Sequence, residues 1–265
     1  MANQPVIIVS GASGGIGSAT ARLFGQMGYR VVLAARNLEK LKHIEAEIIS
    51  HGGVAKAIIT DITQFGSIMN MVEITIKQYQ QIDVLFNNAG IGRLGWLERL
   101  DQQDDIQNQL QSNLLGAVWM TRAVLPYMIE RRSGHIINMI SVAGLIATPT
   151  YSIYSASKFG MRGFTDALRR EVHYHGIHVS AIYPGGVKTG FAHEAVSRRK
   201  TGLRTPKWLV LSAEDVARAV YSLVRRPRRM VVIPWPNRLV WWLTLMFPGL
   251  VDKLVERFFV RLERK

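Results

Sequence analysis

The stretch PVIIVSGASGGIG, residues 5–17, decides the fold of this chain. Its first half is a short apolar run with several β-branched residues, which is typical of a buried strand. Its second half is rich in glycine, and residues 16–27 follow with a helical pattern. A strand, a glycine turn and a helix in this order are the first unit of an α/β fold with a parallel sheet.

The glycine turn contains Gly11, Gly15 and Gly17 in the spacing GxxxGxG, not the GxGxxG that is usual for dinucleotide-binding folds. A turn that binds a dinucleotide must bend sharply, let a diphosphate approach the backbone and direct helix N–H groups towards it. Glycine permits all three. Glycine turns are also common in other proteins, so the motif alone leaves an ordinary structural turn open as the alternative.

Apolar runs alternate with helical patterns up to about residue 234. This alternation predicts a doubly wound parallel sheet with helices on both faces, a Rossmann-type α/β fold. We expect a single domain over residues 1–234 and a C-terminal helical extension over residues 235–265. Strands are predicted at 30–36, 54–60, 82–90, 135–140, 177–183 and 230–234, and helices at 38–53, 64–80, 104–131, 152–175 and 212–225.

Composition limits the chemistry. The 265 residues include no cysteine, so we expect no disulfide, cysteine-based zinc site or thiol nucleophile. We see no secretory signal, and the longest apolar run, Leu239–Val251, is shorter than the ~20 residues of a membrane-spanning helix. We therefore expect a cytoplasmic protein, with peripheral membrane association left open. The net charge of +14 favours anionic partners, but no nucleic-acid motif accompanies it and we expect no nucleic-acid partner.

The end of the second predicted strand indicates which nucleotide would fit. An acidic residue there would bind the adenosine ribose hydroxyls, whereas an arginine would accommodate a 2′-phosphate. The sequence at this point is Ala34, Ala35, Arg36 and Asn37, with no carboxylate. Arg36, together with Ser13 of the glycine turn, favours NADP over NAD. The alternative is a solvated arginine at the start of the next helix.

Several motifs occur in a fixed order along the chain. They are SGASGGIG at 10–17, Asp61, NNAG at 87–90, Asn113, Ser141, Tyr154 with Lys158, and PG at 184–185 followed by Thr189. Through this set the chain resembles the short-chain dehydrogenase/reductase family over residues 5–234. One departure is Ser10, where many members carry threonine, but the hydroxyl is retained.

The resemblance implies a catalytic tetrad and a cofactor cleft. The tetrad would consist of Asn113, Ser141, Tyr154 and Lys158. Asp61 and Ile62 would contact the adenine, Asn87, Ala89 and Gly90 the adenosine side, and the segment from Pro184 to Thr189 the nicotinamide end. The full cofactor set would be Ser10, Gly11, Ser13, Gly15, Ile16, Gly17, Arg36, Asp61, Ile62, Asn87, Ala89, Gly90, Tyr154, Lys158, Pro184, Gly185, Val187 and Thr189.

Tyr154 and Lys158 are four residues apart, so on a helix they share one face. An ammonium near a phenol favours the phenolate and lowers its pKa, which lets the tyrosine exchange a proton with a carbonyl or alcohol oxygen. Ser141 would hydrogen-bond the substrate oxygen as charge develops, and Asn113 would position a water that refills the proton path. The cofactor would supply the hydride.

These features predict an NADP(H)-dependent oxidoreductase that interconverts a hydrophobic ketone or aldehyde with an alcohol. A 3-oxoacyl-thioester reductase is the alternative enzyme. A non-catalytic NADP-binding protein with a regulatory or membrane-associated role is the alternative of another class. The family resemblance also implies a homo-oligomer, a dimer or a tetramer, formed through the helices near 104–131 and 152–175.

His173, His175 and His178 have metal-like spacing but too few neighbouring ligands, and we expect no metal. Residues 190–205 fall where this family places its substrate-covering loop. Their basic run could meet an anionic substrate or be a solvated face. The run comprises Arg198, Arg199 and Lys200, and an apolar entrance is expected from Trp96, Leu97, Phe191 and Trp208.

The C-terminal extension begins with NRLVWWLTLMF and continues with apolar residues at helical spacing. A basic amphipathic helix with Trp and Phe can lie in a membrane interface. It can equally pack on the substrate lobe of its own chain or on a second subunit. The apolar stripe is Leu250, Val251, Leu254, Val255, Phe258, Phe259 and Leu262, and the basic side is Lys253, Arg257, Arg261 and Arg264.

Overall fold

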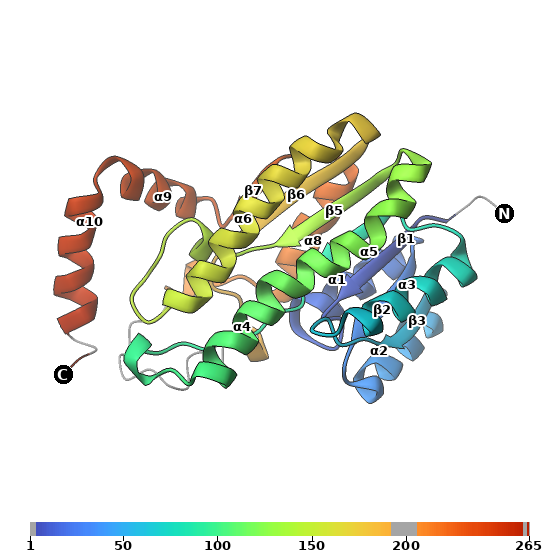
Figure 1. Cartoon of the computed structure of the whole chain (residues 1–265), viewed down its shortest axis with the longest axis horizontal. Coiled ribbons are helices and arrows are strands. Elements are labelled where there is room, and N and C mark those ends of the chain that lie inside the picture. Colours follow the sequence, from blue (N-terminus) through green and yellow to red (C-terminus); the bar gives the residue numbers. More distant parts are fainter. Residues whose placement is uncertain (1–3, 192–205, 262–263, 265) are drawn as a thin grey trace.

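Seven parallel strands form one sheet at the centre of the molecule (Figure 1). The computed structural model describes residues 4–191, 206–261 and 264. The strand order β3-β2-β1-β4-β5-β6-β7 confirms the predicted doubly wound α/β fold. The strands are β1 Val6–Ser10, β2 Arg30–Ala35, β3 Val54–Ile59, β4 Val84–Asn87, β5 Gly134–Met139, β6 Ile177–Pro184 and β7 Met230–Ile233.

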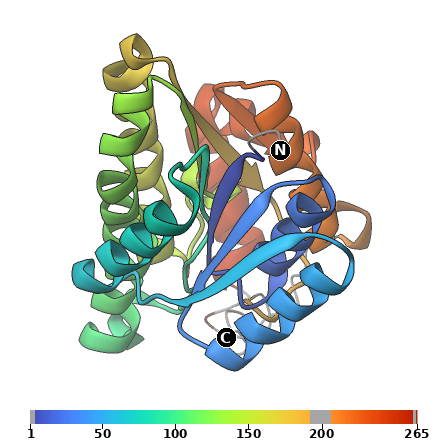
Figure 2. The ribbon, with the colours of Figure 1, turned by 90° about the vertical axis from the view of Figure 1, so that its right-hand side faces the viewer.

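Helices cover both faces of the sheet, as Figure 2 shows edge-on. One apolar cluster joins the sheet to α1, α2 and α8, and a second joins the other face to α3, α5 and α6. The five inner strands, β1, β2, β4, β5 and β6, are buried along almost their whole length, which explains their near-continuous apolar sequences. The helices are α1 Gly15–Gln26, α2 Leu38–Ser50, α3 Phe65–Tyr79, α4 Asn108–Leu110, α5 Gly116–Arg131, α6 Ser152–Val172, α8 Ala213–Arg225, α9 Pro236–Met246 and α10 Pro248–Val255.

Local signals fix where the helices begin and end. Asn37 caps α2 by accepting a hydrogen bond from the Lys40 N–H at 2.9 Å. The Ser212–Asp215 capping box opens α8 as predicted, because each side chain accepts from the backbone N–H of the other. Gly52 follows α2 with φ of +80°, a conformation that glycine adopts without strain.

The helix predicted at 104–131 is not uniform. It contains two loosely wound segments, η2 Gln102–Gln107 and η3 Gln111–Leu115, on either side of α4. Segments with the wider i→i+5 hydrogen bonding often occur at functional sites because they displace side chains from the regular helical pattern. Here the second segment contains Asn113, a residue of the predicted tetrad.

The strand order reverses between β1 and β4, which places a crevice at the carboxyl ends of these two strands. A buried amide network fixes the neighbourhood. Asn87 donates to Thr121 Oγ1 at 3.0 Å and to Asn138 Oδ1 at 2.9 Å, and Asn138 donates to Thr165 Oγ1 at 2.9 Å. The network ties β4 and β5 to α5 and α6, so the loops that leave these strands start from fixed points.

After β7 the chain forms an arm that projects from the body, at the end of the molecule far from the N-terminus (Figure 1). The arm contains α9, α10 and the loosely wound segment η7 Glu256–Val260. No helix in the described part of the chain is both long enough and apolar enough to span a bilayer. Leu262, Glu263 and Lys265, part of the predicted amphipathic stretch, lie outside the described residues.

Candidate active site

The glycine turn is held against the loop that follows β4. The Ser10 hydroxyl accepts hydrogen bonds from the N–H groups of Asn88 at 2.9 Å and Ala89 at 3.1 Å, and donates to the Phe86 carbonyl at 3.2 Å. The Asn88 amide donates in turn to the Ser10 carbonyl at 3.0 Å. Sequence reasoning missed Asn88, whose only signal was its place inside the NNAG motif.

Close packing explains two of the glycines. A Cβ on Gly17 would overlap the carbonyl of Gly11, and a Cβ on Gly11 would lie 2.9 Å from the Cα of Ala89. No side chain caps the N-terminus of α1, and its first turn contains no acidic residue. The first N–H groups of the helix, at Gly15 and Ile16, are therefore directed into a position suited to an anion. The side chain of Thr189 lies 3.4 Å from the Cβ position of Gly15.

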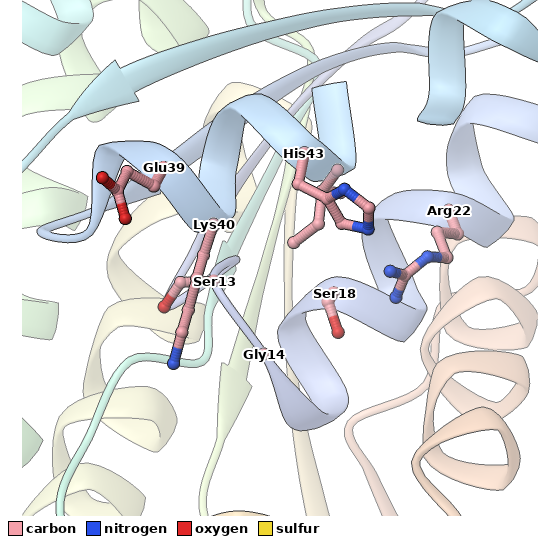
Figure 3. Close-up of a pocket in the computed structure, with 8 residues that line it drawn as sticks. Ser13, Gly14, Ser18, Arg22, Glu39, Lys40 and His43 are labelled. Carbon is pink, nitrogen blue, oxygen red and sulfur yellow. The ribbon is translucent and has the colours of Figure 1, made fainter. Parts of the chain in front are cut away.

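A hollow of about 420 Å³ lies beside this turn, between the first turns of α1 and α2 (Figure 3). Ser13 and Gly14 line one side of it, and Lys40 and His43 the other. Figure 3 shows the Lys40 side chain extending past Ser13. Arg36 is exposed directly after β2. Sequence reasoning identified Ser13 and Arg36 but missed Lys40, although it lies in the first turn of the helix that follows Arg36.

The residues expected on the adenosine side of the cleft differ in whether their side chains or only their backbone can face a nucleotide. Asp61 Oδ1 accepts from the N–H of Thr63 at 2.9 Å and from its hydroxyl at 2.7 Å, which fixes the turn after β3. Ile62 packs against Gly116 at the start of α5. The Asn87 side chain lies in the buried amide network, so only its backbone can face a nucleotide.

Tyr154 and Lys158 lie one turn apart on α6, only 8% and 5% exposed. The Lys158 ammonium is 5.6 Å from the centroid of the Tyr154 ring and donates to the Met139 carbonyl at 3.2 Å. Ser141 follows β5 and accepts from the Ala143 N–H at 3.2 Å. The fold thus brings Ser141, Tyr154 and Lys158 together, because β5 ends and α6 begins at the same edge of the sheet.

Burial dominates the electrostatics of this cluster. It raises the pKa of Tyr154 well above the ordinary value, while a hydrogen bond with Ser141 acts in the opposite direction. Burial also lowers the pKa of Lys158 from 10.5 to about 8. At neutral pH both groups are therefore protonated, and the tyrosine is a neutral phenol. The expectation that Lys158 lowers the pKa of Tyr154 is therefore wrong for this structure, because burial of the phenol raises its pKa.

The Asn113 amide holds the loop after β4. Its oxygen accepts from the Ile91 N–H at 2.7 Å, and its nitrogen donates to the Ile91 carbonyl at 2.9 Å and to Ser157 Oγ at 3.2 Å. A Cβ on Gly90 would lie 2.8 Å from the Asn113 oxygen and 3.9 Å from the Lys158 ammonium nitrogen. Gly90 thus leaves open a space that both groups face.

The opposite wall comes from the chain after β6. The N–H of Gly185, which follows Pro184, donates to the Ile233 carbonyl at 2.7 Å. Val187 forms an isolated parallel bridge with Leu211, which anchors the segment before it reaches Thr189. Because Thr189 lies beside Gly15, this segment closes the groove that the glycine turn opens.

Aromatic side chains flank the tetrad. The rings of Tyr151 and Phe191 lie 6.1 and 6.0 Å from the ring of Tyr154. Leu97 and Trp208 of the predicted entrance are 56% and 75% exposed. Residues 192–205 lie outside the described part of the chain, and with them the basic run at Arg198, Arg199 and Lys200.

The histidines near the end of α6 are apart from this site. The His178 ring contacts the ring of His135, at 5.7 Å between centroids, and His135 is hydrogen-bonded to Ser180 at 2.8 Å. Burial, reinforced by the nearby His178, lowers the pKa of His135 to about 3. Within residues 4–191, 206–261 and 264, no group of three or more potential ligands could hold a metal ion.

Comparison with known proteins matches residues 5–200 to the model of the short chain dehydrogenase family. A bovine protein named dehydrogenase/reductase SDR family member 7B is 33% identical over 94% of this chain and 80% of its own length. A Synechocystis 3-oxoacyl-[acyl-carrier-protein] reductase is 38% identical over 69% of this chain and 74% of its own. The crystal structure of a metagenomic short-chain oxidoreductase in complex with NADP is 31% identical, with a TM-score of 0.75 over 86% of this chain and 96% of that one.

Proposed function

Because this chain belongs to the short-chain dehydrogenase family, we propose that it is an NADP(H)-dependent oxidoreductase that interconverts a carbonyl compound with an alcohol. One observation carries the proposal, namely that Ser141, Tyr154 and Lys158 lie together within reach of the glycine turn. The connection runs through two adjacent residues. Ala89 packs against Gly11 of the turn, and Gly90 faces Lys158.

The groove fits a dinucleotide. Its glycines leave no space for side chains at the strand-to-helix turn, and the uncapped N-terminus of α1 suits a diphosphate. Arg36 and Lys40, with Ser13 beside them, supply cations and a hydroxyl for a 2′-phosphate, and residues 34–37, where β2 ends, contain no carboxylate. Glu39, in the first turn of α2, also lines the hollow, so the two cations have to outweigh one carboxylate there. The metagenomic relative with NADP bound supports the same choice. When bound, the reduced nicotinamide supplies a hydride to the carbonyl carbon.

Tyr154 acts in this proposal as the proton donor for reduction. Its raised pKa keeps the phenol neutral at physiological pH, which is the form that can donate a proton to a carbonyl oxygen. Ser141, hydrogen-bonded to Tyr154, is placed to donate to the same oxygen as it becomes negative. The Lys158 ammonium lies close enough to the phenol to stabilise the phenolate that remains after the transfer.

Asn113 has two functions in the proposal. Its paired hydrogen bonds fix Ile91 and thereby the loop that carries Ala89 and Gly90. Its oxygen and the Lys158 ammonium face the space beside Gly90, where a water can return a proton to the site.

The aromatic surroundings favour a hydrophobic substrate. Tyr151 and Phe191 flank Tyr154, and neither adds a charge. A 3-oxoacyl thioester is the second candidate substrate, supported by the Synechocystis reductase. A binding-only protein would leave the buried Lys158 ammonium without a use that offsets the cost of its burial. We further propose that residues 1–234 are the catalytic unit and 235–265 an extension, and that two copies associate through α5 and α6.

The proposal is tested by following NADPH oxidation with a panel of ketones, aldehydes and 3-oxoacyl thioesters. Tyr154→Phe should lower kcat by about 100-fold or more on any active substrate, since general acid catalysis contributes roughly 10²–10⁴-fold. Tyr174→Phe, which removes an exposed hydroxyl beyond the end of α6, is the matched control. Near-normal turnover by Tyr154→Phe would refute the mechanism.

A further inference from the structure

The C-terminal arm, defined as residues 235–261, exposes large apolar side chains along its length. No charged residue occurs between Leu239 and Val251. Proteins seldom expose contiguous apolar surface of this kind unless it meets a partner or a membrane. Eight large side chains of α9, α10 and the segments after them are 47–66% exposed: Leu239, Trp242, Leu243, Met246, Phe247, Leu250, Leu254 and Phe258.

The arm is attached to the body and is not a loose tail. On the inner side of the arm, Trp241 packs against an apolar cluster that includes Ala181 and Tyr183 of β6. The Arg162 guanidinium lies 5.2 Å from the Trp241 ring centroid. Beyond the far end of the arm, Arg264 pairs with Glu98 at 3.5 Å and lies 4.2 Å from the Trp96 ring centroid. One side of the arm therefore packs on the body of the molecule. The other side is an apolar surface that no described part of the chain covers.

Charges on α10 and η7 are arranged beside the apolar side chains. Leu250, Leu254 and Phe258 are spaced four apart and form one row along the helix. Three exposed cations form the neighbouring row, about 60° around the helix at ~100° per residue. The cations are Lys253, Arg257 and Arg261, of which Arg261 also pairs with Glu256 at 3.0 Å.

The acidic side chains lie beyond the cations. Asp252 and Glu256 are on the far side of the cationic row, as seen from the apolar row. A surface that places aliphatic and aromatic groups first, cations next and acids furthest away matches an anionic lipid interface. There the apolar groups enter the acyl region, while long basic side chains reach up to the phosphates.

We propose that the C-terminal arm binds the surface of an anionic phospholipid bilayer, lying in the plane of the interface with α9 and α10. α9 has 11 residues, which is enough to lie in the interface but not to cross it. A second copy of the chain fits the surface less well. In a two-fold dimer the same patch meets itself, so the cationic rows of two chains that each carry +14 would face one another.

The experiment measures binding of the full chain to sedimented vesicles. Neutral vesicles of phosphatidylcholine are compared with vesicles that contain about 30% phosphatidylglycerol. One variant reverses the cationic row, with Lys253→Glu, Arg257→Glu and Arg261→Glu. A second removes the apolar row, with Leu250→Ser, Leu254→Ser and Phe258→Ser. The matched control reverses three exposed cations on other surfaces, with Lys77→Glu, Arg226→Glu and Arg228→Glu.

We expect the wild type and the control to bind anionic vesicles, and binding to fall when salt is raised to about 0.5 M. Charge reversal on the arm should weaken binding to anionic vesicles on the order of 100-fold. Removal of the apolar row should abolish binding. Circular dichroism and thermal unfolding check that each variant is folded. The proposal is overturned if the wild type binds neither vesicle, or if the control weakens binding as much as the arm variant. It is also overturned if loss of the apolar row leaves vesicle binding unchanged and instead removes a concentration-dependent dimer of the wild type. None of these readouts needs enzyme activity.

Discussion

Asn113 and Gln109 hold the same loop in the same way from successive turns of one helical stretch. Asn113 exchanges two hydrogen bonds with the backbone of Ile91, and Gln109 accepts from the Arg93 N–H at 2.7 Å and donates to the Arg93 carbonyl at 3.3 Å. Both amides are almost fully buried. The loop after β4 is therefore fixed by a pair of side-chain amides, one in the predicted tetrad and one that sequence reasoning did not identify.

Variants of Asn113 and Gln109 can distinguish a structural role in holding the loop from a role in catalysis. Asn113→Ala and Gln109→Ala should each lower the free energy of unfolding by about 1–3 kcal/mol, since each leaves backbone groups unpaired in the interior. Only Asn113→Ala should also lower kcat by about tenfold or more. Urea unfolding and turnover of both variants provide the measurement. Equal effects on kcat would mean that Asn113 has a structural role alone.

Arg36 should determine the choice of nicotinamide cofactor. Arg36→Asp should weaken NADPH binding by roughly 10–100-fold, because a charge-assisted hydrogen bond contributes about 1.5–3 kcal/mol. Lys40→Ala should cause a smaller loss. Binding of NADPH and NADH by titration calorimetry measures both effects, with Lys77→Ala on α3 as the control. An unchanged ratio of NADPH to NADH affinity in Arg36→Asp would rule out this assignment.

Gly17 should tolerate no side chain, whereas Gly14, three residues earlier in the same turn, should accept one. A Cβ on Gly17 overlaps the Gly11 carbonyl, but a Cβ on Gly14 meets nothing within 4 Å. We expect Gly17→Ala to lower the free energy of unfolding by about 1–3 kcal/mol and to weaken NADPH binding. Gly14→Ala should be close to wild type in both measurements. Normal cofactor binding by Gly17→Ala would contradict the packing described for the turn.

Lys158 should make stability rise with pH above neutrality. Burial lowers its pKa in the folded chain from 10.5 to about 8, so the unfolded chain binds more protons between these values. Relative to Lys158→Met, the wild type should gain about 2 kcal/mol between about pH 7 and about pH 9.5. The raised pKa of Tyr154 acts with the opposite sign, but only above about pH 10. Urea midpoints across this range would show the gain, and parallel curves for the two proteins would exclude it.

His135 should make the fold sensitive to acid. Its pKa in the folded state is about 3, so unfolding takes up a proton below about pH 6.5. Between about pH 6.5 and about pH 4.5 the wild type should lose roughly 2–3 kcal/mol more than His135→Gln. His173→Gln, at an exposed position, is the matched control. The prediction fails if both variants lose stability in parallel with the wild type.

The sequence by itself determined the strand–helix alternation and the helix caps, because these depend on local periodicity and on single side chains. Buried runs such as VIIVS become strands wherever helices can cover them, and Ser212 with Asp215 begins α8 whatever surrounds it. The order of the motifs along the chain was enough to place it in its family. Local patterns could equally define the apolar and basic rows of α10.

Only the tertiary structure decided which atoms meet. The two loosely wound segments around α4, the amide pair of Asn113 and Gln109, and the buried position of the Asn87 side chain depend on contacts between distant parts of the chain. The same holds for the depth at which Lys158 lies and for the uncovered outer side of the arm. Burial is a property of the assembled layers. Periodicity can give the face of a helix, but it cannot say whether another element covers that face.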